Sequence, residues 1–269
     1  MSMKVRVLGA YGSALGEKRT CGFLIDDRLM LDAGTISSAS NVPALEKIDD
    51  VLISHAHLDH CKDLAFLTDL IFGRRNDPIS IWGTAEVLGD VQKHLFNNRI
   101  WPDFSVIPSA DKPIVRFHPI DRDVPVKIGN YQVTAIAVNH PVPADGFLID
   151  NGEDVLLYSG DTGETENIWK AGAAQSRLAG ILLETSFPNA MKGIADLSGH
   201  LVPSQVPGEL QKLGPRNSQI PVYIYHLKPQ AEDEIKAEFA ALGLSNVSVV
   251  EQDQVLEISL SKTYSSEHR

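Results

Sequence analysis

Residues 53–60 have the sequence ISHAHLDH, which places three histidines and an aspartate directly after an apolar run. The apolar residues are typical of a short buried strand, so the polar side chains stand where a strand ends and a helix begins. His55 and His57 are spaced to project on one side of an extended segment. Asp59 and His60 follow in the turn. Imidazoles and carboxylates bind zinc and also suit iron, manganese and cobalt, so the stretch predicts a metal site.

The composition favours a globular protein that acts on a small molecule. Of the 269 residues, 43% are hydrophobic and 22% are charged, which is ordinary for a soluble domain. The formal net charge of −11 argues against a long nucleic acid as the partner, because basic patches that neutralise phosphates dominate nucleic-acid affinity. A small phosphodiester is compatible with this charge, and homodimer formation is left open.

Nothing in the sequence predicts a membrane segment or secretion. No apolar run is long enough to span a bilayer, and residues 1–4 lead into a strand pattern without a signal-peptide pattern. Cys21 and Cys61 are the only cysteines, too few for a disulfide framework, and Cys61 is interpreted as an apolar filler rather than a ligand. We therefore expect a cytoplasmic protein with a single domain over residues 1–260 and a disordered tail over residues 261–269.

Strand patterns alternate with helical patterns in both halves of the chain. Strands are expected at residues 4–8, 22–25, 29–31, 51–53, 79–82, 114–117, 124–128, 131–138, 146–149, 155–158, 180–183, 222–225, 247–250 and 255–258. Helices are expected at residues 61–72, 84–97, 164–173 and 204–213, and another should end at Gly243. The segment before Ser198 is expected to be a polar loop. This alternation predicts two sheets packed together with helices outside.

Further ligand-type residues follow other predicted strands, where side chains face a crevice at the edge of a sheet. They are His140, Asp161, Glu184 and His226. Asp32, at the end of another strand, is either a partner that orients a metal-bound imidazole or a turn residue. His94 and His118 have no ligand-type companions nearby and are expected to be structural or exposed.

The number of ligand-type residues favours two metal ions, because a structural zinc needs only four ligands and usually uses cysteines. The simplest assignment gives one ion His55, His57 and His140, gives the other Asp59, His60 and His226, and makes Asp161 the bridge. Such a pair, about 3.5–4 Å apart, holds a bridging hydroxide and clamps the attacking and leaving oxygens, so the expected reaction is hydrolysis. No phosphate-cradling glycine motif and no G-x-S-x-G elbow competes with it.

The order of these residues resembles the metallo-β-lactamase superfamily over nearly the whole chain. The resemblance implies an α+β fold, a four-layer αββα sandwich of two mixed sheets flanked by helices. It also implies a metal-dependent hydrolase with two divalent ions, most of all zinc, with manganese or iron as alternatives. It does not identify the substrate, since the superfamily includes lactamases, thioesterases, lactonases, nucleases and phosphodiesterases.

A narrower resemblance is to the class II cyclic-nucleotide phosphodiesterases. It rests on residues 53–60 together with ETSFP at residues 184–188 and LSGHLVP at residues 197–203. It implies hydrolysis of 3′,5′-cyclic nucleotides such as cAMP to 5′-monophosphates. The chain departs from the pattern where Lys62 and Asp63 replace a glycine often found there, and it is shorter than the fungal members.

We expect three catalytic residues, Asp59, Glu184 and His200. For His200 the narrower resemblance supplies the reason, because the segment of that family that corresponds to residues 198–203 carries a histidine near the metals. A protonated His200 would donate to the leaving 3′ oxygen or hold a phosphate oxygen. Glu184 would accept its other N–H and fix the tautomer.

Three alternatives stay open on the sequence. A tRNase Z-like RNA 3′-processing endonuclease shares the Gly-His pair, but the acidic balance and the lack of a basic arm argue against it. A lactone or ester hydrolase would leave His200 with less to protonate. A di-iron sensor or redox protein would accept the same ligands, but such proteins usually come with a flavin partner or domain.

Overall fold

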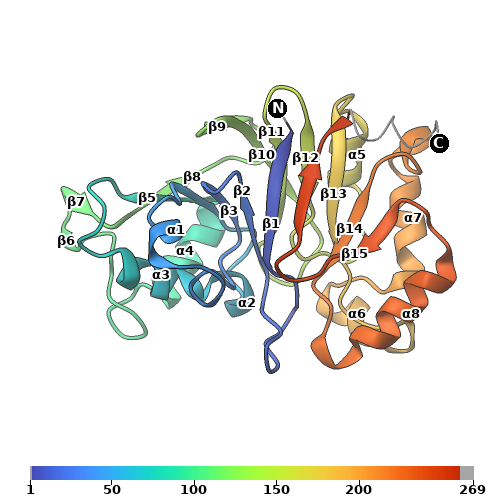
Figure 1. Ribbon diagram of the computed structural model, residues 1–269, viewed down its shortest axis with the longest axis horizontal. Coiled ribbons are helices and arrows are strands. Elements are labelled where there is room, and N and C mark those ends of the chain that lie inside the picture. The colour runs from blue at the N-terminus through green and yellow to red at the C-terminus, as the bar shows by residue number, and fades with distance from the viewer. Residues whose placement is uncertain (1, 261–269) are drawn as a thin grey trace.

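Two mixed sheets face one another at the centre of the protein, as a computed structural model of residues 2–260 shows (Figure 1). The first sheet has the order β16-β1-β2-β3-β4-β5-β8, formed by Val255–Ile258, Met3–Gly9, Gly22–Ile25, Leu29–Leu31, Asp50–Leu52, Ile79–Gly83 and Val115–Pro119. The second has the order β15-β14-β13-β12-β11-β10-β9, formed by Val247–Val249, Val222–Tyr225, Leu178–Glu184, Val155–Tyr158, Asp145–Asp150, Tyr131–Ala137 and Val126–Ile128. A small hairpin pairs β6 (Pro108–Ser109) with β7 (Lys112–Pro113).

Helices cover the outer face of each sheet (Figure 1). Those beside the first sheet are α1 (Val42–Leu45), α2 (Leu58–Cys61), α3 (Asp63–Ile71) and α4 (Ala85–His94). Those beside the second are α5 (Asn167–Ala173), α6 (Lys192–Ser198), α7 (Val206–Gln211) and α8 (Glu232–Leu242). The predicted αββα order and the α+β class are therefore confirmed.

The layers are held by three apolar clusters, one between the sheets and one under each set of helices. Phe23 stands in the cluster between the sheets, with its ring centroid 5.1 Å from that of Tyr225 and 5.8 Å from that of Tyr158. Both contacts are edge-to-face, the arrangement that aromatic quadrupoles favour. All three rings are fully buried, so this cluster fixes how the two sheets sit against each other.

Parallel pairing brings the predicted ligand segments to one edge of the sandwich. In the first sheet β3, β4 and β5 run parallel, and in the second β12, β13, β14 and β15 do. The carboxyl ends of parallel strands meet at the same edge of a sheet. Asp32 therefore emerges beside the 53–60 stretch, and Asp161, Glu184 and His226 emerge beside one another.

One local prediction was wrong. The segment before Ser198 was expected to be a polar loop, but residues 192–198 form helix α6. This helix leaves Ile194 52% exposed and Leu197 84% exposed and buries only Ala195 fully, so it lacks the apolar stripe that identifies a helix in sequence. Gly199 ends it in the left-handed region, at φ 68°.

The other predicted elements agree with the structure within a few residues, whereas α1 and the β6-β7 hairpin were not predicted. The predicted helix at residues 61–72 begins earlier, as α2 at Leu58, and the strand expected at residues 124–128 begins at Val126. The predicted tail over residues 261–269 lies outside the described residues, and the single-domain assignment stays a prediction. Among the residues described, no helix is both long and apolar enough to cross a membrane.

Phe23→Ala should lower the free energy of unfolding by about 3–5 kcal/mol, because it opens a cavity between the sheets. Urea unfolding followed by circular dichroism measures the change at fixed metal content. Val124→Ala, at a side chain that is 53% exposed, is the control and should change stability little. Equal stability of the two variants would contradict this description of the core.

Candidate metal centre

The predicted ligands of the first ion lie together at the carboxyl edge of both sheets. His57 Nδ1 is 3.0 Å from His55 Nε2 and 3.3 Å from His140 Nε2. Asp161 Oδ2 is 3.6 Å from His55 Nε2. One ligand atom from each of these four residues lies within 4.8 Å of the others. The four side chains thus converge on one point, although His140 comes from the other sheet.

The predicted ligands of the second ion also lie close to Asp161. His60 Nε2 and His226 Nε2 are 3.1 Å apart, and Asp161 Oδ2 is 3.3 Å from the first and 3.1 Å from the second. Asp59 Oδ2 is 3.3 Å from His226 Nε2. Asp161 therefore contacts both groups, which is the place expected for a bridging carboxylate.

This donor set fits divalent metal ions. Asp161 Oδ1 is buried without a hydrogen-bond partner in the part of the chain that the structure describes, and such an oxygen is costly unless a ligand satisfies it. Zinc bonds of about 2.0–2.1 Å would place neighbouring ligand atoms about 3.3 Å apart in a tetrahedral site. The nitrogen pairs noted above lie 3.0 Å, 3.1 Å and 3.3 Å apart.

The protonation states also favour metal binding, since an imidazole must be neutral at the nitrogen that binds. Burial lowers the pKa of His140 to about 4 and holds the pKa of His55 well below its usual range. His60 differs: burial opposes its charge, but the carboxylates of Asp161 and Asp32 outweigh burial and hold its pKa well above the usual range. Without a metal, a proton thus compensates these carboxylates, and a metal ion would take over that role.

Asp32 orients His60 from behind. Its Oδ2 lies 2.7 Å from His60 Nδ1, and the hydroxyl of Tyr158 donates to the same oxygen. Ser54 donates its backbone N–H and its hydroxyl to the Asp32 carboxylate, each at 2.7 Å. These bonds hold the His60 ring so that Nε2 faces the other candidate ligands. A carboxylate that accepts a hydrogen bond from a metal-binding histidine commonly orients the ring in this way. The sequence had left this role and a turn role open.

Two backbone features allow the side chains to approach so closely. A Cβ added to Gly12 would lie 2.6 Å from the His226 ring, so only glycine fits there. His226 itself has φ 73°, the left-handed region that residues with a Cβ rarely adopt. Such strain is common at functional sites, where the surrounding structure maintains it.

Glu184 and His200 form a buried pair beside the candidate ligands. Glu184 Oε1 lies 2.8 Å from His200 Nδ1 and accepts a hydrogen bond from the Thr162 backbone N–H at 3.0 Å. Ser186 Oγ lies 3.1 Å from His200 Nδ1 and 2.7 Å from His226 Nδ1. Burial and the charge of Asp161 raise the pKa of Glu184 to about 8, and burial lowers the pKa of His200.

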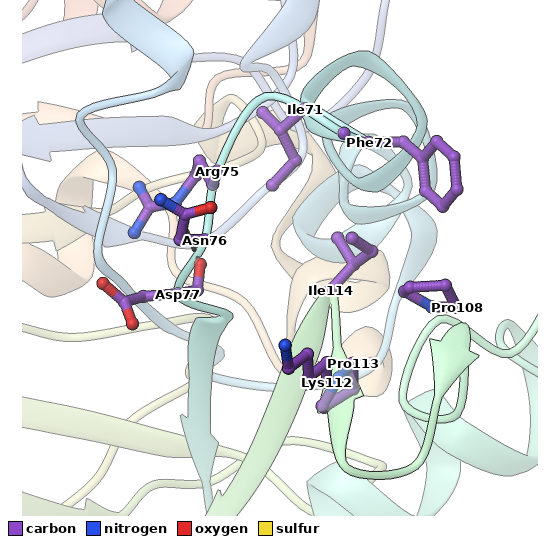
Figure 2. A pocket seen from close by; sticks show the side chains of 10 residues that line it. Ile71, Phe72, Arg75, Asn76, Asp77, Pro108, Lys112, Pro113 and Ile114 are labelled. Atoms are coloured by element: carbon purple, nitrogen blue, oxygen red, sulfur yellow. Dashed lines mark hydrogen bonds between the residues drawn. The ribbon is translucent and has the colours of Figure 1, made fainter.

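A cleft of about 480 Å³ opens over the candidate metal ligands. It is lined by Gly12, Ser13, Ala14, Thr20, His57, Leu58, Asp59, Lys62, Asp161, His200 and Lys228. A substrate in this cleft would meet the ligands of both groups as well as His200. Another cleft, of about 400 Å³, lies between α3 and the β6-β7 hairpin (Figure 2), and none of the predicted site residues lines it.

Several residues of the site were not predicted from the sequence. Lys228 and the segment at residues 12–14 line the cleft, and Ser186 links His200 to His226. The only sequence signal for Lys228 was its place two residues after His226. The segment at residues 12–14 carried no signal, because it meets His226 only through folding.

The remaining cysteines and histidines are partly as expected. Cys61 packs in the apolar cluster under α3, but Cys21 lies within 4.8 Å of the ligand atoms of His60 and His226. Burial, followed by the charge of Asp161, raises the pKa of the Cys21 thiol well above its usual range. His94 is exposed, and the His118 ring stacks on Trp82 with centroids 4.4 Å apart.

Comparison with known protein families matches residues 28–224 to the family described as "Beta-lactamase superfamily domain". The chain belongs to this family. It is 28% identical over 228 residues to a probable 3′,5′-cyclic-nucleotide phosphodiesterase of Yersinia pestis, a match that covers 75% of this chain and 64% of that protein. The predicted membership of the metallo-β-lactamase superfamily, with cyclic-nucleotide phosphodiesterases among the relatives, is confirmed.

Solved structures support the same fold. The crystal structure of unliganded yeast PDE1 superposes with a TM-score of 0.82 at 21% identity, covering 96% of this chain and 99% of that one. Human tRNase Z, short form, superposes with a TM-score of 0.68 at 14% identity, covering 96% and 100%. At these identities the likeness shows the fold alone.

The matched region spans about three fifths of the length of the curated sequence relatives, 64% and 60% for two of them.

Asp161→Ala should weaken binding at both predicted metal positions, because a bridging carboxylate serves each ion. Metal content after dialysis, measured by inductively coupled plasma mass spectrometry, should fall for both equivalents. Asp121→Ala, at an exposed carboxylate, is the matched control. Retention of one equivalent at wild-type affinity would show that Asp161 does not bridge.

Proposed function

We propose that this protein hydrolyses 3′,5′-cyclic nucleotides such as cAMP to 5′-monophosphates with two divalent metal ions. The observation that carries the proposal is the joint arrangement at one cleft: two groups of ligand-type side chains share Asp161, and His200 stands beside them, paired with Glu184. The relatives named as cyclic-nucleotide phosphodiesterases support the substrate class.

The ions are assigned to the chain's own residues as the sequence predicts. His55, His57 and His140 would hold one, Asp59, His60 and His226 the other, and Asp161 both. When bound, two such ions lower the pKa of water and neutralise charge on the attacking and leaving oxygens of a phosphoryl group. Zinc suits the ligands, and manganese or iron would also fit.

His200 is proposed as the proton donor to the 3′ oxygen. The Glu184–His200 pair shares one proton between Oε1 and Nδ1, which lie 2.8 Å apart. Because the pKa of Glu184 is raised to about 8, the carboxyl group holds that proton at neutral pH and donates it to Nδ1, so the neutral imidazole of His200 carries its own proton on Nε2. Because His200 lines the cleft and its Nδ1 faces Glu184, Nε2 is the atom that would protonate the leaving oxygen.

The nearest alternative is an RNA 3′-processing endonuclease of the tRNase Z type, which has the same fold. The formal net charge of −11 disfavours it, because a long polyanion is held by basic surface. A lactone or ester hydrolase is the second alternative, although its reaction would make less use of the Glu184–His200 pair as a proton donor. Cytoplasmic location and homodimer formation stay predictions.

The metal-loaded protein should be assayed with several metals against cyclic nucleotides, bis(p-nitrophenyl) phosphate, precursor tRNA and lactones. Turnover of a 3′,5′-cyclic nucleotide to its 5′-monophosphate, followed by chromatography, is the expected outcome. Turnover of lactones alone would refute the phosphodiesterase proposal. Far more efficient cleavage of precursor tRNA would favour the endonuclease.

His200→Ala should lower kcat by roughly 10²–10⁴-fold while leaving metal content near that of the wild type, if His200 acts as a general acid. Steady-state kinetics and metal analysis on the same preparation separate the two effects. His94→Ala, at an exposed histidine, is the matched control. Loss of metal from His200→Ala would mean that His200 is a ligand instead.

A further inference from the structure

Lys228 lies at the candidate metal cleft in a fixed position. It follows His226 by two residues, and its backbone N–H donates to the Ser186 carbonyl at 2.9 Å. Its Nζ donates to the Gly12 carbonyl at 2.8 Å and lies 5.5 Å from the centroid of the Phe187 ring. The ammonium is therefore held between the 12–14 segment and the end of β14, on the wall of the cleft.

The charge of Lys228 has no acidic partner among the residues described, where no carboxylate oxygen lies within 4.0 Å of its Nζ. Two other lysines of the protein do have acidic partners. Lys62, which lines the same cleft, pairs with Asp63 at 3.2 Å, and Lys18 pairs with Glu232. In a chain with 35 acidic residues, an uncompensated and partly buried ammonium at the cleft points to an anion that binds there.

The hydrogen-bond inventory supports the same conclusion. An ammonium has three N–H donors, and the Gly12 carbonyl takes one of them. The aromatic ring of Phe187 faces the cation without accepting a conventional hydrogen bond. Two donors thus remain on a side chain that lines the same cleft as Asp161 and His200.

The proposed reaction makes an anion of increasing charge. Water adds to phosphorus, the bond from phosphorus to the 3′ oxygen breaks, and that oxygen takes a proton. The diester carries one negative charge and the monoester product carries between one and two at neutral pH, since its second pKa is about 6. A cation placed at the non-bridging oxygens therefore binds the substrate and gains interaction energy as the charge grows.

We propose that Lys228 binds a non-bridging oxygen of the phosphoryl group and so selects anionic phosphodiesters over neutral esters. The inference rests on the proposed function, because it assigns the phosphoryl group to the cleft above Asp161 and His200. Lys228 acts as a substrate-binding residue here, and the Gly12 carbonyl keeps its ammonium in place.

The test measures binding of inorganic phosphate to the metal-loaded protein by isothermal titration calorimetry. Lys228→Gln, which keeps a donor for Gly12 but removes the charge, should weaken phosphate binding by about 10-fold or more. It should raise KM for bis(p-nitrophenyl) phosphate more than it lowers kcat. Lys228→Arg should restore most of the affinity, and Lys170→Met, at an exposed lysine on α5, should leave it unchanged.

Three results would overturn the inference. They are wild-type phosphate affinity in Lys228→Gln, equal losses in the Gln and Arg variants, and an equal loss of turnover for the neutral ester p-nitrophenyl acetate. Metal content and melting temperature are recorded for each variant, and Lys228→Arg decides if Lys228→Gln proves unstable. Charge-dependent phosphate binding without any turnover of cyclic nucleotides would support this inference while refuting the proposed function.

Discussion

The buried carboxylate of Asp161 stands at the point where strand ends of both sheets meet. It lies 3.1–3.6 Å from imidazole nitrogens of His55, His60 and His226 and keeps one oxygen without a partner among the described atoms. A buried negative charge is expensive unless cations or metal ions surround it. The imidazoles that surround Asp161 follow strands of both sheets. Parallel pairing of the central strands places the ends of these strands at one edge of the sandwich.

The proposed metal binding and the proposed choice of substrate rest on different residues. The imidazoles and aspartates that meet at Asp161 belong to a pattern that many superfamily hydrolases with different substrates would share. The proposal of an anionic diester as substrate rests on the Glu184–His200 pair and Lys228, which all come from the second half of the chain. The residues that line the cleft therefore say more about the substrate than the candidate metal ligands do.

The sequence predicted the layers and the ligand-type residues because each of them follows an apolar strand, and strand periodicity is a local signal. It failed where no local signal exists. Helix α6 presents Ile194 and Leu197 to solvent, so it has no buried stripe to detect. Cys21 reaches the site only through tertiary packing and lies near His60, whereas the cysteine next to His60 in sequence is Cys61. For Lys228 the sequence offered only its place two residues after His226.

The ligand-type residues are divided between the two sheets. Those of the 53–60 stretch follow β4, whereas His140, Asp161 and His226 follow strands of the second sheet. Any ion held by both sets would join the two halves of the sandwich as a non-covalent crosslink, in addition to the aromatic cluster around Phe23. Because ligands that bind only the folded state stabilise it by mass action, the mechanical integrity of the sandwich would then follow the free metal concentration in its surroundings.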